Sequence, residues 1–346
     1  MPAAAIENQY RIATSAAGLM QRADRGLIAI TGKDRAAWLH NLVTHAIKTL
    51  PAGDGNYAFA TNVKGRTIFD GNLLVLADRI WLDLDRRWLD AAMKHLSRYV
   101  ITEEVSLAEQ TAQWARFSLA GPAADEVIGR LGIASLSQMA QLQHVEFGWH
   151  GAAGRLARND AWVGLPTAEL WIESGGGAAL EAALLDAGRG AGLARIEAPT
   201  VEILRIEAGI PASLSDIDDQ VIPSETLQAE RGISYHKGCY LGQEVLERMR
   251  SHGVLARRLV GLSLSGEPAE GTLPATISVA GSESGRLTSC CWSFARAGWV
   301  GLGILKSAHS ADGQEVEIRA GDALITGRII SLPMRSSGAA DGGKMD

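Results

Sequence analysis

The chain has 346 residues, of which 47% are hydrophobic and 21% charged, and its formal net charge is −6. These values are typical of a globular protein, and the length suits two or three domains. The negative charge gives no overall attraction to nucleic acid, and no apolar run is long enough to span a bilayer. We therefore expect neither a membrane protein nor a basic nucleic-acid-binding domain.

The cysteines and the chain ends indicate a reducing compartment. Three cysteines, two of them adjacent at Cys290 and Cys291, cannot form a disulfide framework, and no His/Cys cluster gives a metal site. Residues 1–24 lack the layout of a signal peptide, so we expect a cytoplasmic protein with an N-terminal extension there. Ser, Gly and Ala near the end predict a disordered tail at 334–346.

Residues 25–110 mix strands and helices. Helical spacing of apolar residues predicts helices at 33–45 and 88–99. Apolar or alternating runs predict strands at 26–30, 56–62, 67–76, 80–85 and 105–108. The run 80–85 alternates strictly, with Trp81, Asp83 and Asp85 on one face.

A second lobe is expected at 111–252. Its predicted strands are 114–119, 145–149, 154–158 and 170–173, and its predicted helices are 122–131, 178–185, 201–208 and 243–250. The order lacks the regular strand–helix alternation of a doubly wound sheet. We therefore predict an α+β fold with split βαβ, ferredoxin-like units in both lobes.

After residue 253 the pattern changes to short strands separated by turns. They are predicted at 259–264, 276–279, 285–291, 299–305, 315–319 and 323–330. This spacing predicts a small C-terminal β-barrel at 253–333.

The most informative stretch is an octapeptide with a single cysteine between two glycines. It reads Lys237-Gly238-Cys239-Tyr240-Leu241-Gly242-Gln243-Glu244 and precedes a predicted helix. A helix N-terminus and a neighbouring lysine favour a thiolate, which would make Cys239 reactive. The alternative is a small cysteine packed in a tight turn, as most free cysteines are.

This octapeptide resembles the signature of the YgfZ family, folate-binding proteins related to the T-protein (aminomethyltransferase) of the glycine cleavage system. The resemblance extends from about residue 25 to about residue 332. Further similar segments are 30–34, 38–39, 62–66, 204–211, 222–225 and 285–289. It implies a two-lobed, T-protein-like body and a C-terminal barrel around a central channel.

The resemblance also implies a ligand, tetrahydrofolate or a derivative, and residues that contact it. Glu207 matches a glutamate that holds the pterin ring in T-proteins, and a carboxylate can accept paired N–H bonds from an aminopyrimidine edge. Tyr99 could stack on the ligand and Arg248 could bind its glutamate tail. Their alternatives are a core tyrosine and a helical pair between Arg248 and Glu244.

The aspartate that assists one-carbon transfer in T-proteins aligns with Asn72 of this chain. Asp70 lies two residues earlier on the same predicted strand, so both side chains share one face. If Asn72 holds that place, the group that manages protons is missing, which counts against aminomethyl transfer. Asp70 could replace it physically.

Two functions follow from the resemblance. The first is an accessory protein for assembly or repair of iron–sulfur clusters in client enzymes, and thereby for tRNA modification, with Cys239 and Lys237 as working residues. Cys239 would then be a transient cluster ligand or a thiol-exchange group. The second is a tetrahydrofolate-dependent one-carbon transferase. Direct tRNA binding is expected to be weak, because the net charge is negative. A basic region is formed by Arg248, Arg250, Arg257 and Arg258 with His252, and a solvated surface is the simpler explanation for it.

Overall fold

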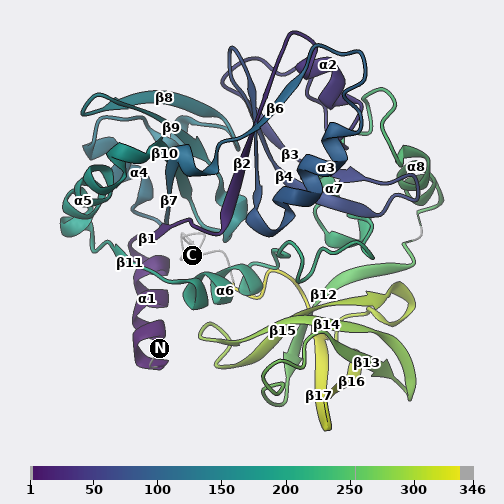
Figure 1. Ribbon diagram of the computed structural model, residues 1–346. Coiled ribbons are helices and arrows are strands. Elements are labelled where there is room, and N and C mark those ends of the chain that lie inside the picture. Colours follow the sequence, from purple (N-terminus) through teal and green to yellow (C-terminus); the bar gives the residue numbers. More distant parts are fainter. Residues whose placement is uncertain (1–2, 254, 336–346) are drawn as a thin grey trace, which may run out of the picture.

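A computed structural model describes residues 3–253 and 255–335, which form two sheet-containing lobes and a C-terminal barrel (Figure 1). The α+β fold class and the C-terminal barrel predicted from the sequence are confirmed. Within the described residues, no helix is long and apolar enough to cross a membrane.

The first lobe is an antiparallel five-stranded sheet in the order β3-β4-β5-β2-β6. Its elements are β2 (Arg25–Thr31), α2 (Arg35–His40), β3 (Gly55–Thr61), β4 (Thr67–Val75), β5 (Ile80–Asp85), α3 (Leu89–Ser97) and β6 (Ser106–Glu109). Helices α2 and α3 cover one face, where Ile80, Leu82 and Leu84 of the alternating strand β5 are buried. The apolar half of that alternation thus forms the outer core.

The helix expected at 33–45 ends at His40. Beyond it the chain pairs with β3: Val43 bridges Ala60, and the backbone N–H of Thr44 donates to the carbonyl of Phe59 at 2.8 Å. Hydrogen bonding to the sheet therefore replaces the last helical turn that the apolar spacing predicts.

The second lobe is a six-stranded sheet in the order β11-β1-β7-β10-β9-β8, antiparallel except for the β1–β11 pair. Its elements are β1 (Gly18–Gln21), β7 (Trp114–Ala120), α4 (Ala124–Arg130), β8 (His144–Trp149), β9 (Ala152–Arg158), β10 (Thr167–Glu173), α5 (Gly177–Gly188) and β11 (Ala194–Arg195). Helices α4 and α5 cover its outer face.

The structure differs from the expected N-terminal extension at 1–24. Helix α1 (Ala3–Ser15) packs on α6 (Ala198–Glu207), and β1 is hydrogen-bonded between β7 and β11. The chain therefore begins in the second lobe and crosses to the first at β2. Periodicity over so short a segment could not reveal this, because β1 is only four residues long.

The inner faces of the two sheets pack against each other. Tyr57, Phe59 and Trp81 of the first sheet share one buried cluster with Trp171 of the second, and the Trp81 and Trp171 ring centroids are 6.1 Å apart. Strand β5 is consequently buried on both faces, and the carboxylate of Asp83 is fully buried. The polar half of the alternation thus faces the other lobe.

The C-terminal strands close into a barrel in the order β12-β15-β14-β13-β16-β17. They are β12 (Arg257–Leu264), β13 (Ala275–Val279), β14 (Ser282–Ser293), β15 (Gly298–Lys306), β16 (Glu315–Ala320) and β17 (Ala323–Ile330). Helix α6 packs on β14 and β15 and so joins the barrel to the second lobe. The predicted tail at 334–346 lies mostly outside the described residues; Met334 is buried against the α6 region.

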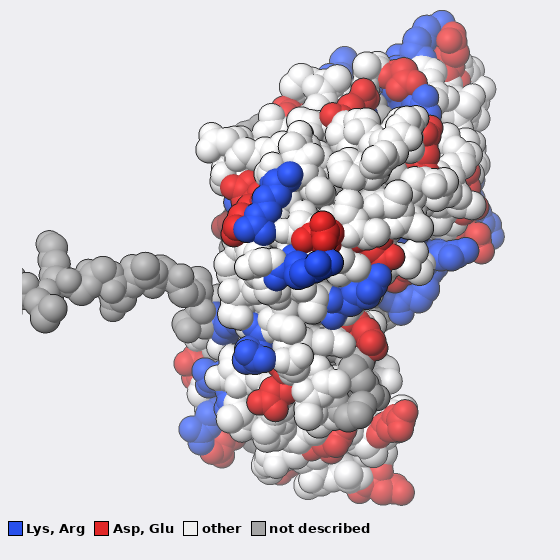
Figure 2. Space-filling view, turned by 90° about the vertical axis from the view of Figure 1, so that its left-hand side faces the viewer, with Lys and Arg blue, Asp and Glu red and all other residues white. Residues whose placement is uncertain are grey.

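Two short helices, α7 (Ala229–Gly232) and α8 (Gln243–His252), lie beside the first lobe. Figure 2 shows acidic and basic side chains interspersed over one face of the molecule. Two arginines of the expected basic region have acidic partners: Arg250 pairs with Glu247 and Arg257 with Glu225. Such pairing agrees with a solvated, locally neutralised surface.

His144 is a buried contact between the lobes. Its backbone N–H donates to the carbonyl of Gly53 at 2.7 Å, and its Nδ1 lies 2.6 Å from Nη1 of Arg155. Burial, followed by the charge of Arg155, lowers the pKa of His144 to about 4. The folded protein therefore contains a neutral imidazole where the unfolded chain binds a proton below about pH 6.5.

We expect this histidine to make the free energy of unfolding fall as pH falls from about 6.5 to 4, by on the order of 3 kcal/mol when complete. Urea unfolding of the wild type and His144→Gln at pH 7.5, 6.0 and 5.0 measures the effect. The variant should show a shallower pH slope by about one proton, whereas the exposed-site control His150→Gln should keep the wild-type slope. Equal slopes in all three proteins would contradict the assignment.

Candidate functional site

A central cavity of about 590 Å³ lies where the inner faces of the two lobes meet α6. Strands β4, β7 and β10, the β1–β2 connection, helices α6 and α7, and the segment 210–213 contribute to its wall. This volume is within the range of small-molecule and cofactor sites.

Asp70 projects into this cavity from β4. Its carboxylate accepts hydrogen bonds from the Tyr57 hydroxyl at 2.8 Å and the Ser213 hydroxyl at 2.6 Å. Burial, and then the charge of Asp70, raises the pKa of Tyr57 well above its ordinary value, so the phenol remains a proton donor. A carboxylate held by two hydroxyl groups is fixed in orientation at the cavity wall.

Asn72 lies on the same face of β4 and also lines the cavity. Its amide donates to Asp83 at 3.2 Å, so it connects the wall to the interface between the lobes. The structure thus brings together the two β4 residues singled out in the sequence. Asp70 is the acid of the pair.

Arg231 of α7 was not identified from the sequence. Its guanidinium carbon lies 3.8 Å from the centroid of the Tyr57 ring, in a cation–π arrangement on the cavity wall. Helix α7 has only four residues, so no periodicity marks it. Nothing in the sequence indicates that this arginine supports the partner of Asp70.

Buried charges lie beneath the cavity, between the lobes. Arg116 pairs with Asp83 of the first lobe and, at 3.0 Å, with Glu169 of its own lobe. Burial lowers the pKa of Arg116 to about 9, although Glu169 favours the charged form. Burial would raise the pKa of Glu169, but Arg116 and Arg22 outweigh it and hold that pKa below its ordinary value. The carboxylate therefore stays ionised.

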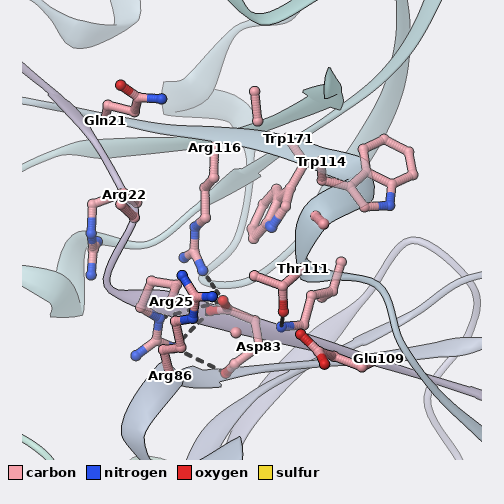
Figure 3. A pocket seen from close by; sticks show the side chains of 15 residues that line it. Gln21, Arg22, Arg25, Asp83, Arg86, Glu109, Thr111, Trp114, Arg116 and Trp171 are labelled. Atoms are coloured by element: carbon pink, nitrogen blue, oxygen red, sulfur yellow. Dashed lines mark hydrogen bonds and ion pairs between the residues drawn. The ribbon is translucent and has the colours of Figure 1, made fainter. Parts of the chain in front are cut away.

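A second hollow of about 250 Å³ adjoins the same charges. Figure 3 shows Arg25 and Arg116 converging on Asp83, with Trp114 and Trp171 on the other side. Arg25 and Asp83 are 2.8 Å apart. Both hollows are lined by Arg22, Arg25, Arg86 and Arg116. These four arginines thus form a wall that the two hollows share.

Glu207, expected to bind folate, does not line the cavity. Its fully buried carboxylate accepts from Tyr10 at 2.6 Å and from Ser293 at 2.6 Å, and Arg335 lies 3.5 Å away. Both carboxylate oxygens are held by groups of the protein, so the carboxylate is directed toward α1 and the barrel. A folate contact through Glu207 stays a prediction. Glu207 joins α1, α6 and the barrel.

The cavity face of α6 is formed instead by Glu202 and Arg205. Arg205 pairs with Glu202 and, at 2.8 Å, with the buried Asp216. Asp216 also accepts from Thr288 and Ser289 of β14. These contacts fix the segment that carries Ser213, the partner of Asp70.

The cysteine loop, residues 237–242, lies beside the β3–β4 turn and contributes no residue to the cavity. Thr61 donates to the carbonyl of Leu241 at 2.5 Å, and Tyr240 is buried. Gly242 caps α8 with φ = 83°, and a Cβ there would lie 2.5 Å from the carbonyl oxygen of Asn62. Only glycine fits this turn without strain. Cys239 itself is exposed.

The other octapeptide side chains support the loop. Gln243 accepts from the backbone N–H of Tyr240 at 3.3 Å, and Glu244 and Gly238 are exposed. The amine of Lys237 donates to three backbone carbonyls of residues 40–45, so its N–H groups are engaged there.

Tyr99 and Arg248, expected as folate contacts, do not line the cavity. Tyr99 packs against the outer core of the first lobe, with its ring centroid 5.2 Å from that of His95. Arg248 is an exposed residue of α8. The position of Tyr99 favours the core alternative. For Arg248, both the folate contact and the pair with Glu244 stay predictions.

The paired barrel cysteines are structural. Cys291 is buried in the cluster that joins the barrel to α6, and Cys290 is half-buried against the barrel core. Burial raises the pKa of Cys290 to about 11. Among the described residues, no group of three His, Cys, Asp or Glu side chains is placed to hold a metal ion.

Comparison with known families matches nearly the whole chain. The GCVT N-terminal domain family matches residues 2–229, and the glycine cleavage T-protein C-terminal barrel domain matches residues 257–334. The boundary between the two matches falls where the barrel begins.

Individual relatives agree with this division. An aminomethyltransferase of Rubrobacter xylanophilus is 26% identical over 337 residues, which are 95% of this chain and 86% of that protein. A chloroplastic Arabidopsis thaliana protein with a general transferase name is 27% identical over 301 residues, which are 85% of this chain and 66% of that protein. The crystal structure of aminomethyltransferase T from Bartonella henselae superposes with a TM-score of 0.83 at 20% identity, covering 95% of this chain and 89% of that one.

Proposed function

Because this chain belongs to the glycine cleavage T-protein family, we propose that its central cavity binds tetrahydrofolate or a derivative. The observation that carries the proposal is the fixed carboxylate of Asp70 in a cavity of suitable volume. Asp70 of β4 and Glu202 of α6 line this cavity, and a carboxylate there can accept the paired N–H bonds of an aminopyrimidine edge. Arg86, exposed at the wall, can meet a carboxylate of the folate tail.

A bulky side chain in the cavity should weaken the binding of tetrahydrofolate. Ala198 is exposed at the cavity wall, so we expect Ala198→Trp to weaken tetrahydrofolate binding at least ten-fold, about 1.4 kcal/mol or more. Ala182→Trp, at an exposed position on α5, is the matched control and should bind as the wild type does. Calorimetric titration measures both, and equal affinity in the two variants would exclude the central cavity.

We further propose that the protein is of the YgfZ type within its family and supports iron–sulfur cluster assembly or repair in client enzymes. Through those clients it would support tRNA modification. The proposal is supported by the exposure of Cys239 on a loop that Thr61 anchors outside the cavity, where a partner protein can reach the thiol. A thiol so placed can take part in exchange or serve as a transient ligand to a cluster delivered as cargo.

Replacing the sulfur should separate this role from folate binding. In cells that lack the gene, we expect Cys239→Ser to leave client enzyme activity near the level of the null strain, because Ser cannot ligate iron or exchange thiols comparably. The purified variant should still bind tetrahydrofolate with wild-type affinity. Full restoration of client activity by Cys239→Ser would exclude a working role for the thiol.

One-carbon transfer is the second candidate function, and one observation favours it. Asp70 lies in the cavity with a fixed carboxylate. The chain therefore has an acid two residues from Asn72, the position that aligns with the T-protein aspartate. A positioned carboxylate can assist proton transfer at a folate nitrogen.

If the protein catalyses this reaction, tetrahydrofolate-dependent turnover of an aminomethyl donor should fall by about 10²–10⁴-fold in Asp70→Asn. Turnover is also measured in Asn72→Asp, because this variant places an acid at the position that aligns with the T-protein aspartate. Absence of turnover in the wild type under saturating tetrahydrofolate would exclude this candidate and leave the accessory role.

A further inference from the structure

The amine of Lys237 is surrounded by backbone carbonyl oxygens. Nζ donates to the carbonyls of His40, of Val43 at 2.6 Å and of His45 at 3.1 Å. An ammonium group has three N–H donors, and each finds one acceptor here. Among the described residues, no carboxylate forms an ion pair with this amine.

The fold explains why these carbonyls are available. Helix α2 ends at His40, and the last carbonyls of a helix lack intrahelical donors and carry the negative end of its dipole. The chain then bends to pair Val43 with Ala60 of β3, which turns the carbonyls of 43 and 45 toward the same point. The result is a ring of neutral oxygens.

The surroundings also suit a cation. The ring of Tyr240 lies 4.9 Å from Nζ on another side, in cation–π range. His40 and His45 have lowered pKa values, through burial and then in part through the charge of Lys237. Neutral imidazoles next to the ring of oxygens avoid like-charge repulsion.

We propose that the carbonyls of His40, Val43 and His45 form a site for a small monovalent cation of the ammonium type, which Lys237 fills from within the chain. The filled site holds the cysteine loop against the first lobe. This inference rests on the proposed function only where it makes Cys239 important. Binding of a cation by the three carbonyl oxygens does not depend on that function.

The cation site supplies a polar attachment at the start of the loop, in addition to the buried ring of Tyr240. On one side of it, Thr44 donates to the carbonyl of Gly232 at 2.5 Å and accepts from the N–H of Ser234 at 3.0 Å. On the other side, Thr61 holds Leu241. Lys237 lies between these anchors, two residues before the thiol. Removing the ammonium should therefore loosen residues 236–240 without detaching the flanking segments.

Two opposing effects decide the charge of the amine. Burial lowers the pKa of Lys237 to about 7, whereas three carbonyl acceptors favour the charged form. At pH 6 the amine is predominantly an ammonium group even at a pKa of about 7, and the carbonyl acceptors favour that form further. The test is therefore made at that pH.

Hydrogen–deuterium exchange of the full chain at pH 6 tests the proposal with Lys237→Ala, Lys237→Met and the exposed neighbour Lys64→Met. The N–H of Tyr240 donates to the side chain of Gln243 at 3.3 Å, and the N–H of Gln243 donates to the carbonyl of Tyr240 at 3.2 Å, so both amides are protected. We expect these two amides to exchange at least ten-fold faster in both Lys237 variants and at the wild-type rate in Lys64→Met. In Lys237→Ala, ammonium or methylammonium chloride should restore slow exchange. Tetramethylammonium chloride at equal ionic strength should not, because it has no N–H donor and is too large.

Unchanged exchange in both Lys237 variants would overturn the proposal. Faster exchange that every salt or none restores would also overturn it, since the lysine stem and not a cation site would then hold the loop. Met keeps most of the stem volume, so Lys237→Met gives the answer if Lys237→Ala loses its fold. Barrel amides of β14 report folding independently. None of these outcomes depends on whether Cys239 serves client enzymes.

Discussion

The ion pairs buried between the two sheets constrain the relative position of the lobes and the shape of the cavity between them. Arg116 could not be buried alone, and it is stabilised by Asp83 of one lobe and Glu169 of the other. Because the two carboxylates come from different sheets, the pairs fix how the lobes face each other. Arg116 lines both hollows, Asp83 lines the smaller one and Glu169 the larger one, so one group of contacts sets the position of the lobes and the shape of the site.

The barrel takes part in the site although it supplies no residue to the cavity wall. Hydroxyl groups of β14 bind Asp216, which also holds Arg205 and the backbone N–H of Ala212. The next residue, Ser213, donates to Asp70. A continuous series of polar contacts therefore runs from the barrel to the acid in the cavity. These contacts connect the barrel physically to the cavity wall.

The sequence predicted what periodicity and local chemistry determine. Strands such as β5 and the barrel strands, and the placement of Asp70 and Asn72 on one face, follow from alternation. The partners of buried charges do not: Arg116 meets Glu169 only after β7 and β10 have paired, and it meets Asp83 only after the two sheets have stacked. The same holds for Glu207, whose occupation by Tyr10 and Ser293 depends on α1 and the barrel converging on α6. A local match to a folate-binding segment cannot reveal such partners.

The cavity and the thiol are separate sites that share one strand. Tyr57 of β3 holds Asp70 in the cavity, and Thr61 at the end of β3 holds the cysteine loop, four residues or about 13 Å further along. Arg231 packs on Tyr57, and the chain reaches Cys239 eight residues later. Strand β3 therefore contacts the cavity through Tyr57 and the cysteine loop through Thr61, so one strand supports both places in the fold.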